Sequence, residues 1–374
     1  MNTSVLRDEL YAHLTNIGAG KNPGLVHRTK EMYRAAHLHQ RSQKQTQDQE
    51  FLLYAKEKYA HLFANGYEVK PDRLDVSVEL VKPGTWQAEL FRLVTHFWSV
   101  PVSRGFGRRL RFLVWDSSNE KLVGLFALGD AVFNLRIRDE FIGWDASQRK
   151  KRLVSLMDAY VVGAIPPYNS LLCGKLVAAL IKSREVTEAF RDRYRHSVGV
   201  ISGEKKNPYL AAVTVTSALG RSSIYNRLKL GDDLIFRGLG YTEGWGHFHI
   251  PEELFEKITC LLKSKRNGNV EAYNFGQGPN WRFRMLRDGL KLLGMEPGLL
   301  NHGYRREVFF SGVADNHMEI LNEKQKRARY EGVKSVSELS AIAVERWVRP
   351  RSISRPDYRT QVKETFLRAL SGYV

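Results

Sequence analysis

The sequence is poor in cysteine. Its 374 residues include two, Cys173 and Cys260, and neither stands in a Cys-x-x-Cys pair. Such pairs supply the thiolates of zinc ribbons and of dithiol redox centres, so the sequence predicts neither kind of site. Two isolated thiols are also typical of a reducing compartment, and we therefore expect the protein to be cytoplasmic.

Long hydrophobic runs are absent as well. The most apolar stretch, LMDAYVVGAI, is interrupted by Asp158 and is far shorter than the roughly 20 residues that cross a bilayer as a helix. The first residues, MNTSVLRDELYAHL, are charged and periodic, unlike a secretory signal peptide. We see no internal repeat and no low-complexity tract. These features predict a protein that has no membrane partner.

Acidic residues are scarce relative to basic ones. Asp and Glu number 40 against 58 Lys and Arg, which gives a formal net charge of +18. Basic side chains that neutralise phosphates release condensed counterions, so a polyanion is the expected partner. The charge therefore favours nucleic acid, and the alternative is a basic protein whose charge only keeps it in solution.

What the chain does contain is enough apolar material for a sizeable core, since 43% of its residues are hydrophobic. Its length predicts about two or three domains. The patterns divide it into a basic helical region over residues 1–75, an α/β core over residues 76–260 and a mostly helical region over residues 261–374. In the first region, SVLRDELYAHL places Val5, Leu6, Leu10 and Leu14 on one side of a helix.

The core region alternates between strand and helix patterns. RLDVSVELV predicts a strand, and RRLRFLVWD and KLVGLFALGDAV predict a hairpin joined by the turn SSNE. A helix with an apolar face, AELFRLVTHFWSVP, lies between the first strand and the hairpin. The following segments predict an apolar strand in SLMDAYVVGAI, one helix in KLVAALIKSREVTEAFRDRY, a strand in YLAAVTVTSAL, a short helix in RSSIYNRLK and a hairpin in LIFRGLGYTEGWGHFHI.

The last region is mostly helical. GPNWRFRMLRDGLKLLGM predicts a helix that starts after Pro279 and ends near Gly294. SVSELSAIAVERWV opens with Ser335 and Glu338 at the spacing of a capping box. RPRSISRP is expected to be an irregular basic linker.

The order of elements in the core resembles the acetyltransferase fold of the Gcn-related family. In that fold a central strand leads into a loop that holds the coenzyme pyrophosphate at a helix start, and a later helix carries a tyrosine. The counterparts here are SLMDAYVVGAI, the loop PPYNSLLCGK with Gly174 beside Lys175, and SSIYNRLK. The resemblance implies coenzyme A binding by the loop and a general acid at Tyr225. The residues leave open that Tyr225 is simply a packed tyrosine.

A longer resemblance covers most of the chain, from about residue 60 to residue 350. Its pieces occur in order: FLVWDSSNEKLVGLFALGDAVFNLRIRDEFIGWD, PPYNSLLCGKLVAALIKSREV, GRSSIYNRL and NHGYRREVFF. Together they resemble the family of the Druantia anti-phage protein DruA. In that family an Arg-Asp-x-x-Ile-Gly-Trp segment follows a hairpin strand, as Arg138 to Trp144 do here. The resemblance implies a bacterial phage-defence module with a large helicase-like partner, and it assigns no catalytic residues.

The segment RDEFIGWD admits three interpretations. Asp139, Glu140 and Asp145 carry carboxylates that suit a divalent cation, which would make a metal-dependent nuclease. The segment can instead be a binding edge. In the structural interpretation, Arg138 and Asp139 pair with neighbouring backbone or with each other's partners, Ile142 and Trp144 cap the core and Gly143 makes a turn.

Five basic runs favour nucleic acid more than any single motif does. SRGFGRRLR surrounds Phe106 with arginines and glycines, which suits phosphate contact and base stacking, and SQRKKR follows IGWD directly. WRFRMLR places Arg284 and Arg287 on one helical face, while KQKRAR and RPRSISR add further charge. GRSSIYNRL predicts either an anion site at a helix start or ordinary capping by Ser222 or Ser223. The predicted nucleic-acid-binding residues are Arg104, Arg108, Arg109, Arg111, Arg149, Lys150, Lys151, Arg152, Lys175, Arg221, Ser222, Ser223, Arg284 and Arg287.

We therefore predict an α/β (α+β) protein with a mixed, acetyltransferase-like central sheet flanked by helices and with basic helical N- and C-terminal regions. The predicted function is anti-phage defence through DNA binding within a multi-protein system. No helix-turn-helix, zinc-finger or RNA-recognition signature is visible, so contacts to the backbone are expected rather than base readout. The alternatives are an acetyltransferase that uses coenzyme A and Tyr225, a nuclease that uses Asp139 and Asp145, and an assembly scaffold. No cofactor can be assigned.

Overall fold

The computed structural model describes residues 3–16, 28–102, 107–198, 203, 205–247, 250–265 and 281–371. The chain folds into two compact units, each assembled from separate stretches. Unit 1 comprises Met1–Leu38, Ala218–Arg221 and Tyr241–Arg306, and unit 2 comprises His39–Ser217, Ser222–Gly240 and Glu307–Val374. The predicted division at residues 75 and 260 instead makes each domain one continuous stretch of the chain, and it stays a prediction.

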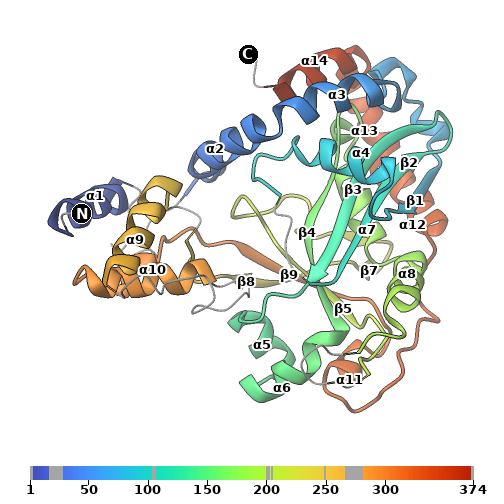
Figure 1. Ribbon diagram of the computed structural model, residues 1–374. Helices are drawn as coiled ribbons and strands as arrows, with labels where there is room; N and C mark the ends of the chain where they lie inside the picture. The colour runs from blue at the N-terminus through green and yellow to red at the C-terminus, as the bar shows by residue number, and fades with distance from the viewer. Residues whose placement is uncertain are drawn as a thin grey trace. The chain divides into compact units, whose positions relative to one another are not determined.

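Unit 2 is built on a seven-stranded mixed sheet with the order β1-β2-β3-β4-β5-β9-β8 (Figure 1). The strands are β1 (Val76–Leu80), β2 (Arg109–Asp116), β3 (Lys121–Asp130), β4 (Leu156–Ala164), β5 (Ala212–Thr216), β8 (Arg237–Tyr241) and β9 (Glu307–Gly312). β1 to β4 pair antiparallel, β4 and β5 pair parallel, and β5 and β9 pair antiparallel. The predicted α/β class and mixed sheet are confirmed.

The parallel pair at the centre of the sheet is short. β4 and β5 are in register from Leu156 opposite Ala212 to Asp158 opposite Thr214, whereas β4 continues to Ala164. On its other edge, β4 has a bulge, because the register with β3 shifts between Ala127 and Leu128 and leaves Tyr160 as the additional residue. The centre of the sheet is therefore irregular on both edges of β4.

Helices cover both faces of this sheet. They are α3 (Gln49–Tyr59), α4 (Trp86–Thr95), α5 (Arg136–Ile142), α6 (Ala146–Arg152), α7 (Cys173–Leu180), α8 (Arg184–Tyr194), α11 (His317–Leu321), α12 (Val336–Ala343), α13 (Arg349–Ser354) and α14 (Lys363–Arg368). One face packs Leu110, Phe112 and Met157 against α7 and α12. The opposite face packs Leu113 and Val161 against α3 and α4 at one end. At its other end it packs Leu156 and Phe310 against Ile142 and Trp144, near α5, α6 and α11 in Figure 1.

The strands expected in RLDVSVELV, in the hairpin around SSNE and in YLAAVTVTSAL are confirmed as β1, β2, β3 and β5. The hairpin expected in LIFRGLGYTEGWGHFHI is wrong, since β8 pairs instead with β9. β9 had no strand prediction, because its inner residues from Val308 to Ser311 are all buried and show no alternation.

Two helix predictions and one linker prediction needed correction. KLVAALIKSREVTEAFRDRY forms two helices, since α7 ends at Leu180 and α8 begins at Arg184 after its N-cap Ser183. RSSIYNRLK is a turn, in which the Ser222 hydroxyl accepts from the N–H groups of Ile224 and Tyr225 without a helix following. RPRSISRP is mostly helical as α13, because a proline near a helix start costs no hydrogen bond.

Unit 1 has an apolar core of its own. Leu6, Leu10 and Leu14 of α1 (Thr3–Asn16) are buried together with residues of α9 (Glu252–Lys265) and α10 (Trp281–Leu292), whereas Val5 is 53% exposed. A Cβ on Gly289 of α10 would lie 2.3 Å from Cγ2 of Ile258, so this glycine lets α9 and α10 approach closely. α2 (Lys30–Gln47) contributes residues to both units. Among the helices of the described ranges, none has the length and hydropathy needed to cross a membrane.

Candidate nucleic-acid interface

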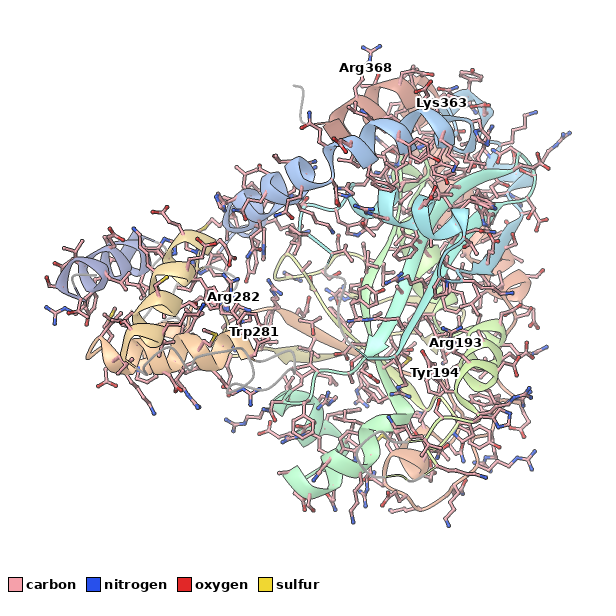
Figure 2. All side chains as sticks on the ribbon, viewed as in Figure 1. Arg193, Tyr194, Trp281, Arg282, Lys363 and Arg368 are labelled. Carbon is pink, nitrogen blue, oxygen red and sulfur yellow. The ribbon has the colours of Figure 1, made fainter. Side chains whose placement is uncertain are left out.

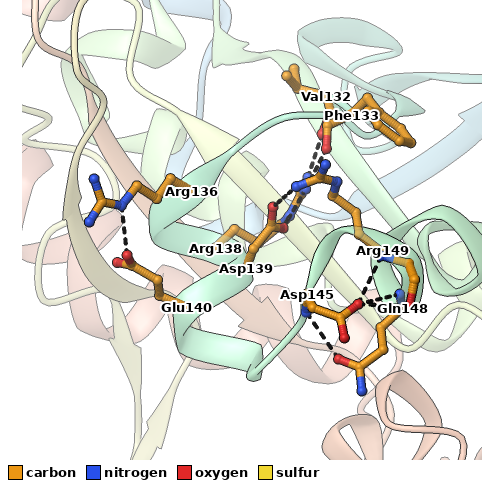
Figure 3. A network of polar contacts seen from close by, with 10 residues as sticks. Val132, Phe133, Arg136, Arg138, Asp139, Glu140, Asp145, Gln148 and Arg149 are labelled. Atoms are coloured by element: carbon orange, nitrogen blue, oxygen red, sulfur yellow. Dashed lines mark hydrogen bonds and ion pairs between the residues drawn. The ribbon is translucent and has the colours of Figure 1, made fainter.

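A group of hydrogen-bonded charges in unit 2 surrounds Arg138, whose side chain is completely buried. Its Nε and Nη2 donate to Oδ1 of Asp139 at 2.9 and 2.7 Å, and Nη1 donates to the carbonyl of Val132 at 2.6 Å. Nη2 also donates to the carbonyl of Phe133, and Nη1 of Arg149 reaches Oδ2 of Asp139 at 2.8 Å (Figure 3). We call these five residues the closed cluster, because both carboxylate oxygens of Asp139 already accept from guanidinium groups.

The rest of RDEFIGWD completes this arrangement. Gly143 follows α5 with a φ of 84°, a left-handed conformation that favours glycine and ends the helix. The indole N–H of Trp144 donates to the carbonyl of Leu321 at 2.9 Å, and Ile142 is buried beside it. The contacts expected in the structural interpretation of this segment are confirmed.

Asp145 is exposed and caps α6. Its carboxylate accepts from the N–H groups of Ser147 and Gln148, and the Gln148 side chain accepts from the N–H of Asp145 in a capping box (Figure 3). The hydrogen bond from the Gln148 N–H is the main reason why the pKa of Asp145 lies below its usual value. Glu140 pairs with Arg136 at 2.7 Å.

Within the described ranges, no three His, Cys, Asp or Glu side chains are grouped so that they could hold a metal ion. A cation at Asp139 would have to displace a guanidinium from one of its oxygens. The nuclease chemistry suggested for Asp139 and Asp145 stays a prediction.

The residues suggested for acetyl transfer lie in packed surroundings. Tyr225 is buried, its ring lies 5.2 Å from that of Phe236, and burial raises its pKa. In the loop before α7, the carbonyl of Ser170 accepts from Arg351 at 3.2 Å and its hydroxyl accepts from Gln361 at 2.8 Å. A coenzyme pyrophosphate at this loop would have to replace those contacts, and coenzyme A binding stays a prediction.

The arginines of SRGFGRRLR are held largely inside the unit. Arg104 and Phe106 lie outside the described residues. Arg108 pairs with Asp130 at 2.6 Å, donates to the carbonyl of Val154 and has a side chain that is 12% exposed. Arg109 and Arg111 lie on the sheet face beside Tyr160.

SQRKKR divides into two kinds of side chain. Arg149 belongs to the closed cluster, and Arg152 pairs with Glu323 at 3.1 Å. Lys150 and Lys151 are exposed, and neither has an ion pair among the described residues. Of the four cations in SQRKKR, only these two lysines have no counter-charge in the described ranges.

The residues predicted to bind phosphate in GRSSIYNRL, together with Lys175, differ in their surroundings. The N–H of Ser222 donates to the carboxylate of Glu307 at 2.9 Å, so the chain itself places an anion where a phosphate was predicted. Ser223 and Arg221 are exposed. The amino group of Lys175 lies 5.8 Å from the ring centre of Trp347.

Arg284 and Arg287 belong to α10 of unit 1, where both are exposed as predicted for one helical face. Arg282, labelled on the same helix in Figure 2, instead pairs with Glu252 at 2.7 Å and lies over the ring of Phe255. The predicted residues are thus distributed over both units.

A larger basic surface brings α6 together with three segments that are distant in sequence. The pair between Arg152 and Glu323 joins α6 to the loop after α11. Asn207 donates to the carbonyl of Lys326, and the hydroxyl of Tyr330 donates to the carbonyl of Leu210. The N–H of Lys206 donates to the carbonyl of Ser197 just after α8.

We call this surface the basic end. Its exposed cations are Lys150, Lys151, Arg191, Arg193, Arg195, Lys205, Lys324, Lys326, Arg327 and Arg329. None of the ten has an ion pair among the described residues, and Arg193 projects from α8 beside the buried Tyr194 (Figure 2). KQKRAR was recognised as a basic run, but the arginines of α8 were missed because they alternate with Asp192 and Tyr194.

The fold and this surface define a mixed α/β protein with an exposed cationic end. The family model described as Druantia protein DruA matches residues 27–323. The chain therefore belongs to the DruA family, as its motifs predicted, and so to the proteins of Druantia anti-phage defence.

One relative is Druantia protein DruA of Escherichia coli (strain UMEA 4076-1). It is 47% identical over 361 residues, which cover 95% of this chain and 89% of the relative. No solved structure matches the chain. The likeness to acetyltransferases stays a prediction.

Proposed function

We propose that this protein contributes to anti-phage defence by binding DNA through the basic end. The observation that carries the proposal is that ten exposed cations gather on four connected segments without an ion pair among the described residues. A surface of this kind attracts a polyanion and gains free energy by releasing counterions.

The proposed contacts are to the phosphate backbone. Lys and Arg side chains at the basic end project from two helices and two loops, and contacts of such side chains to phosphates position a protein on nucleic acid without reading its sequence. Binding is therefore expected to depend strongly on salt and weakly on sequence.

The test compares two variants that lose the same charge. One carries Lys150→Gln, Lys151→Gln, Lys326→Gln and Arg327→Gln at the basic end. The control carries Lys70→Gln, Arg73→Gln, Lys82→Gln and Arg368→Gln, four exposed cations elsewhere on unit 2. Binding to labelled single- and double-stranded DNA and RNA is measured by fluorescence anisotropy at several salt concentrations, with cleavage checked in magnesium.

The basic-end variant is expected to bind DNA more weakly, with a salt slope reduced by roughly 0.9 for each phosphate of the double helix that it no longer neutralises. The control is expected to remain close to the unmodified protein. Equal losses in both variants, or no binding by the unmodified protein at low salt, would contradict the proposal.

We further propose that the protein acts beside other Druantia subunits, including the helicase-like partner implied by the family resemblance. Co-purification of that subunit with the tagged protein, in the presence and absence of nuclease, tests this part. Failure to co-purify under both conditions would contradict it.

A further inference from the structure

A second cationic site lies on the sheet face that carries α3 and α4. Along β2, Leu113 packs against α4, but Arg111 and Arg109 continue the same face beyond it. Along β4, Leu156 packs against Trp144, and Asp158 and Tyr160 continue that face. The polar strip, comprising Arg109, Arg111, Asp158, Tyr160 and Thr214, thus separates two apolar clusters on one face of unit 2.

Gly129 gives the strip its geometry. It lies opposite Arg109 on β3, and a Cβ built there would be 2.0 Å from Nη1 of Arg109 and 3.2 Å from Cδ1 of Tyr160. The Arg109 side chain therefore crosses β3 directly over this glycine. Its guanidinium reaches the ring of Tyr160, with 4.3 Å between Cζ and the ring centre. Stacking on an aromatic ring holds a guanidinium flat while leaving its edge for hydrogen bonds.

Arg111 adds a second guanidinium next to the first. It lies two residues along β2, opposite Ala127, and its Nε is 3.4 Å from the Tyr160 hydroxyl. Its guanidinium also lies 5.7 Å from the ring centre of Phe91. Small residues on β3 thus allow two arginines of β2 to extend toward β4.

The two cations are not neutralised within the described part of the chain. Neither Arg109 nor Arg111 has a carboxylate at ion-pair distance there, and the Nε of Arg109 is buried without a hydrogen-bond partner. Asp158 is the nearest acidic group on the strip, but its oxygens accept from the Thr214 hydroxyl and from the N–H of Val132. Burial also raises the pKa of Asp158, which weakens it as a counter-charge.

We propose that the polar strip binds a phosphate group, with Arg109 and Arg111 as its cationic ligands and the Tyr160 hydroxyl as a further hydrogen-bond donor. Planar guanidiniums match phosphate oxygens in pairs, and a buried donor without a partner gains most from such a ligand. The phosphate is carried either by a free nucleotide or by a nucleic-acid strand. The polar strip shares no residue with the basic end, so the proposal does not depend on the proposed function.

The decisive variant is Gly129→Ala, which keeps every charge. Its methyl group would displace the end of the flexible Arg109 side chain, so the fold should tolerate it while the guanidinium moves. Arg109→Gln removes the cation, and Arg73→Gln is the control for loss of one exposed arginine. The probes are inorganic pyrophosphate, ATP and a labelled single-stranded DNA, measured by calorimetry or anisotropy, with circular dichroism to confirm folding.

The unmodified protein is expected to bind at least one probe, and Gly129→Ala and Arg109→Gln are expected to weaken that binding roughly tenfold or more. Arg73→Gln should leave it unchanged. Loss of pyrophosphate or ATP binding identifies a free nucleotide as the source, whereas an effect on DNA alone identifies a strand. The basic-end variant should still bind pyrophosphate or ATP where the unmodified protein does.

The proposal is overturned if none of the three probes binds. It is also overturned if the folded Gly129→Ala and Arg109→Gln proteins bind every probe as tightly as the unmodified protein does.

Discussion

Arg149 and Lys150 are adjacent in the sequence and belong to regions that use charge in opposite ways. Arg149 enters the closed cluster, where the carboxylate of Asp139 and two backbone carbonyls accept from guanidiniums. Lys150 stands at the basic end among cations without ion pairs in the described ranges. A basic run in a sequence is therefore not one surface, because its side chains alternate between holding the fold and facing the solvent.

The largest effect is expected when the closed cluster is opened. Arg138→Met should lower the free energy of unfolding by about 3–5 kcal/mol, because it leaves Asp139 buried with one partner and two carbonyls unpaired. Urea denaturation monitored by circular dichroism measures this. Lys150→Met is the control and should change stability by less than about 0.5 kcal/mol. Similar losses in both variants would remove the distinction between the two regions.

Another buried polar side chain, His96, makes the free energy of unfolding depend on pH. Burial, aided by the charge of Lys44 and opposed by Asp48, lowers the pKa of His96 to about 4 from 6.5. The folded state therefore keeps this ring neutral while the unfolded chain takes up a proton below pH 6.5. Stability due to His96 is complete above that pH and is lost as the pH falls toward 4, by on the order of 3 kcal/mol.

His96→Gln should remove this part of the pH dependence, as measured by urea denaturation at a series of pH values. His196→Gln, at an exposed position, is the matched control and should leave the pH dependence in place. An unchanged profile in His96→Gln would contradict the assignment.

Asp145 connects the two regions, since it begins the helix that carries both Arg149 and Lys150. Asp145→Ala should cost about 1 kcal/mol in unfolding free energy through loss of the cap, and Asp145→Asn should recover most of it. DNA affinity should change little. If the protein cleaves DNA with magnesium and both variants abolish cleavage without loss of stability, the capping interpretation is insufficient.

The smallest effect is expected at Glu323, the partner of Arg152. Glu323→Gln removes a negative charge from the basic end, so DNA binding should strengthen about twofold at low salt while stability changes by less than about 1 kcal/mol. Anisotropy titrations measure the change in affinity. A weaker affinity would mean that the pair positions the loop more than it neutralises charge.

The sequence predicted local elements well where the pattern itself was decisive. The hairpin of β2 and β3 and the capping box of Ser335 and Glu338 are confirmed, because turn residues and alternation are local signals. β9 was missed, since a strand buried on both faces has no alternation to read. The break between α7 and α8 was missed as well, because the polar residues around Ser183 also fit the exposed side of a continuous helix.

The sequence predicted that the candidate site would be basic, but it did not predict which basic residues would form it. The sequence identified Lys150, Lys151 and the KQKRAR run, but nothing local showed that Arg108 would be paired with Asp130. The polar strip could not be predicted either, because it forms only where Gly129 of one strand leaves room for Arg109 of another. Pairing across strands is a tertiary property, and basic charge alone does not reveal it.

The interleaving of the two units has a consequence for how the protein is made. On the ribosome, α1 emerges before unit 2, yet its apolar partners on α9 and α10 follow only after most of unit 2 has been synthesised. The sheet in turn stays without β9 beside β5 until residue 312 has emerged, and Leu367 and Leu370 complete the packing around α3 later still. Unit 1 therefore cannot close before Arg306 has been synthesised, and unit 2 cannot close before the residues around Leu370 have been, so we expect the nascent protein to expose apolar surface through most of its translation.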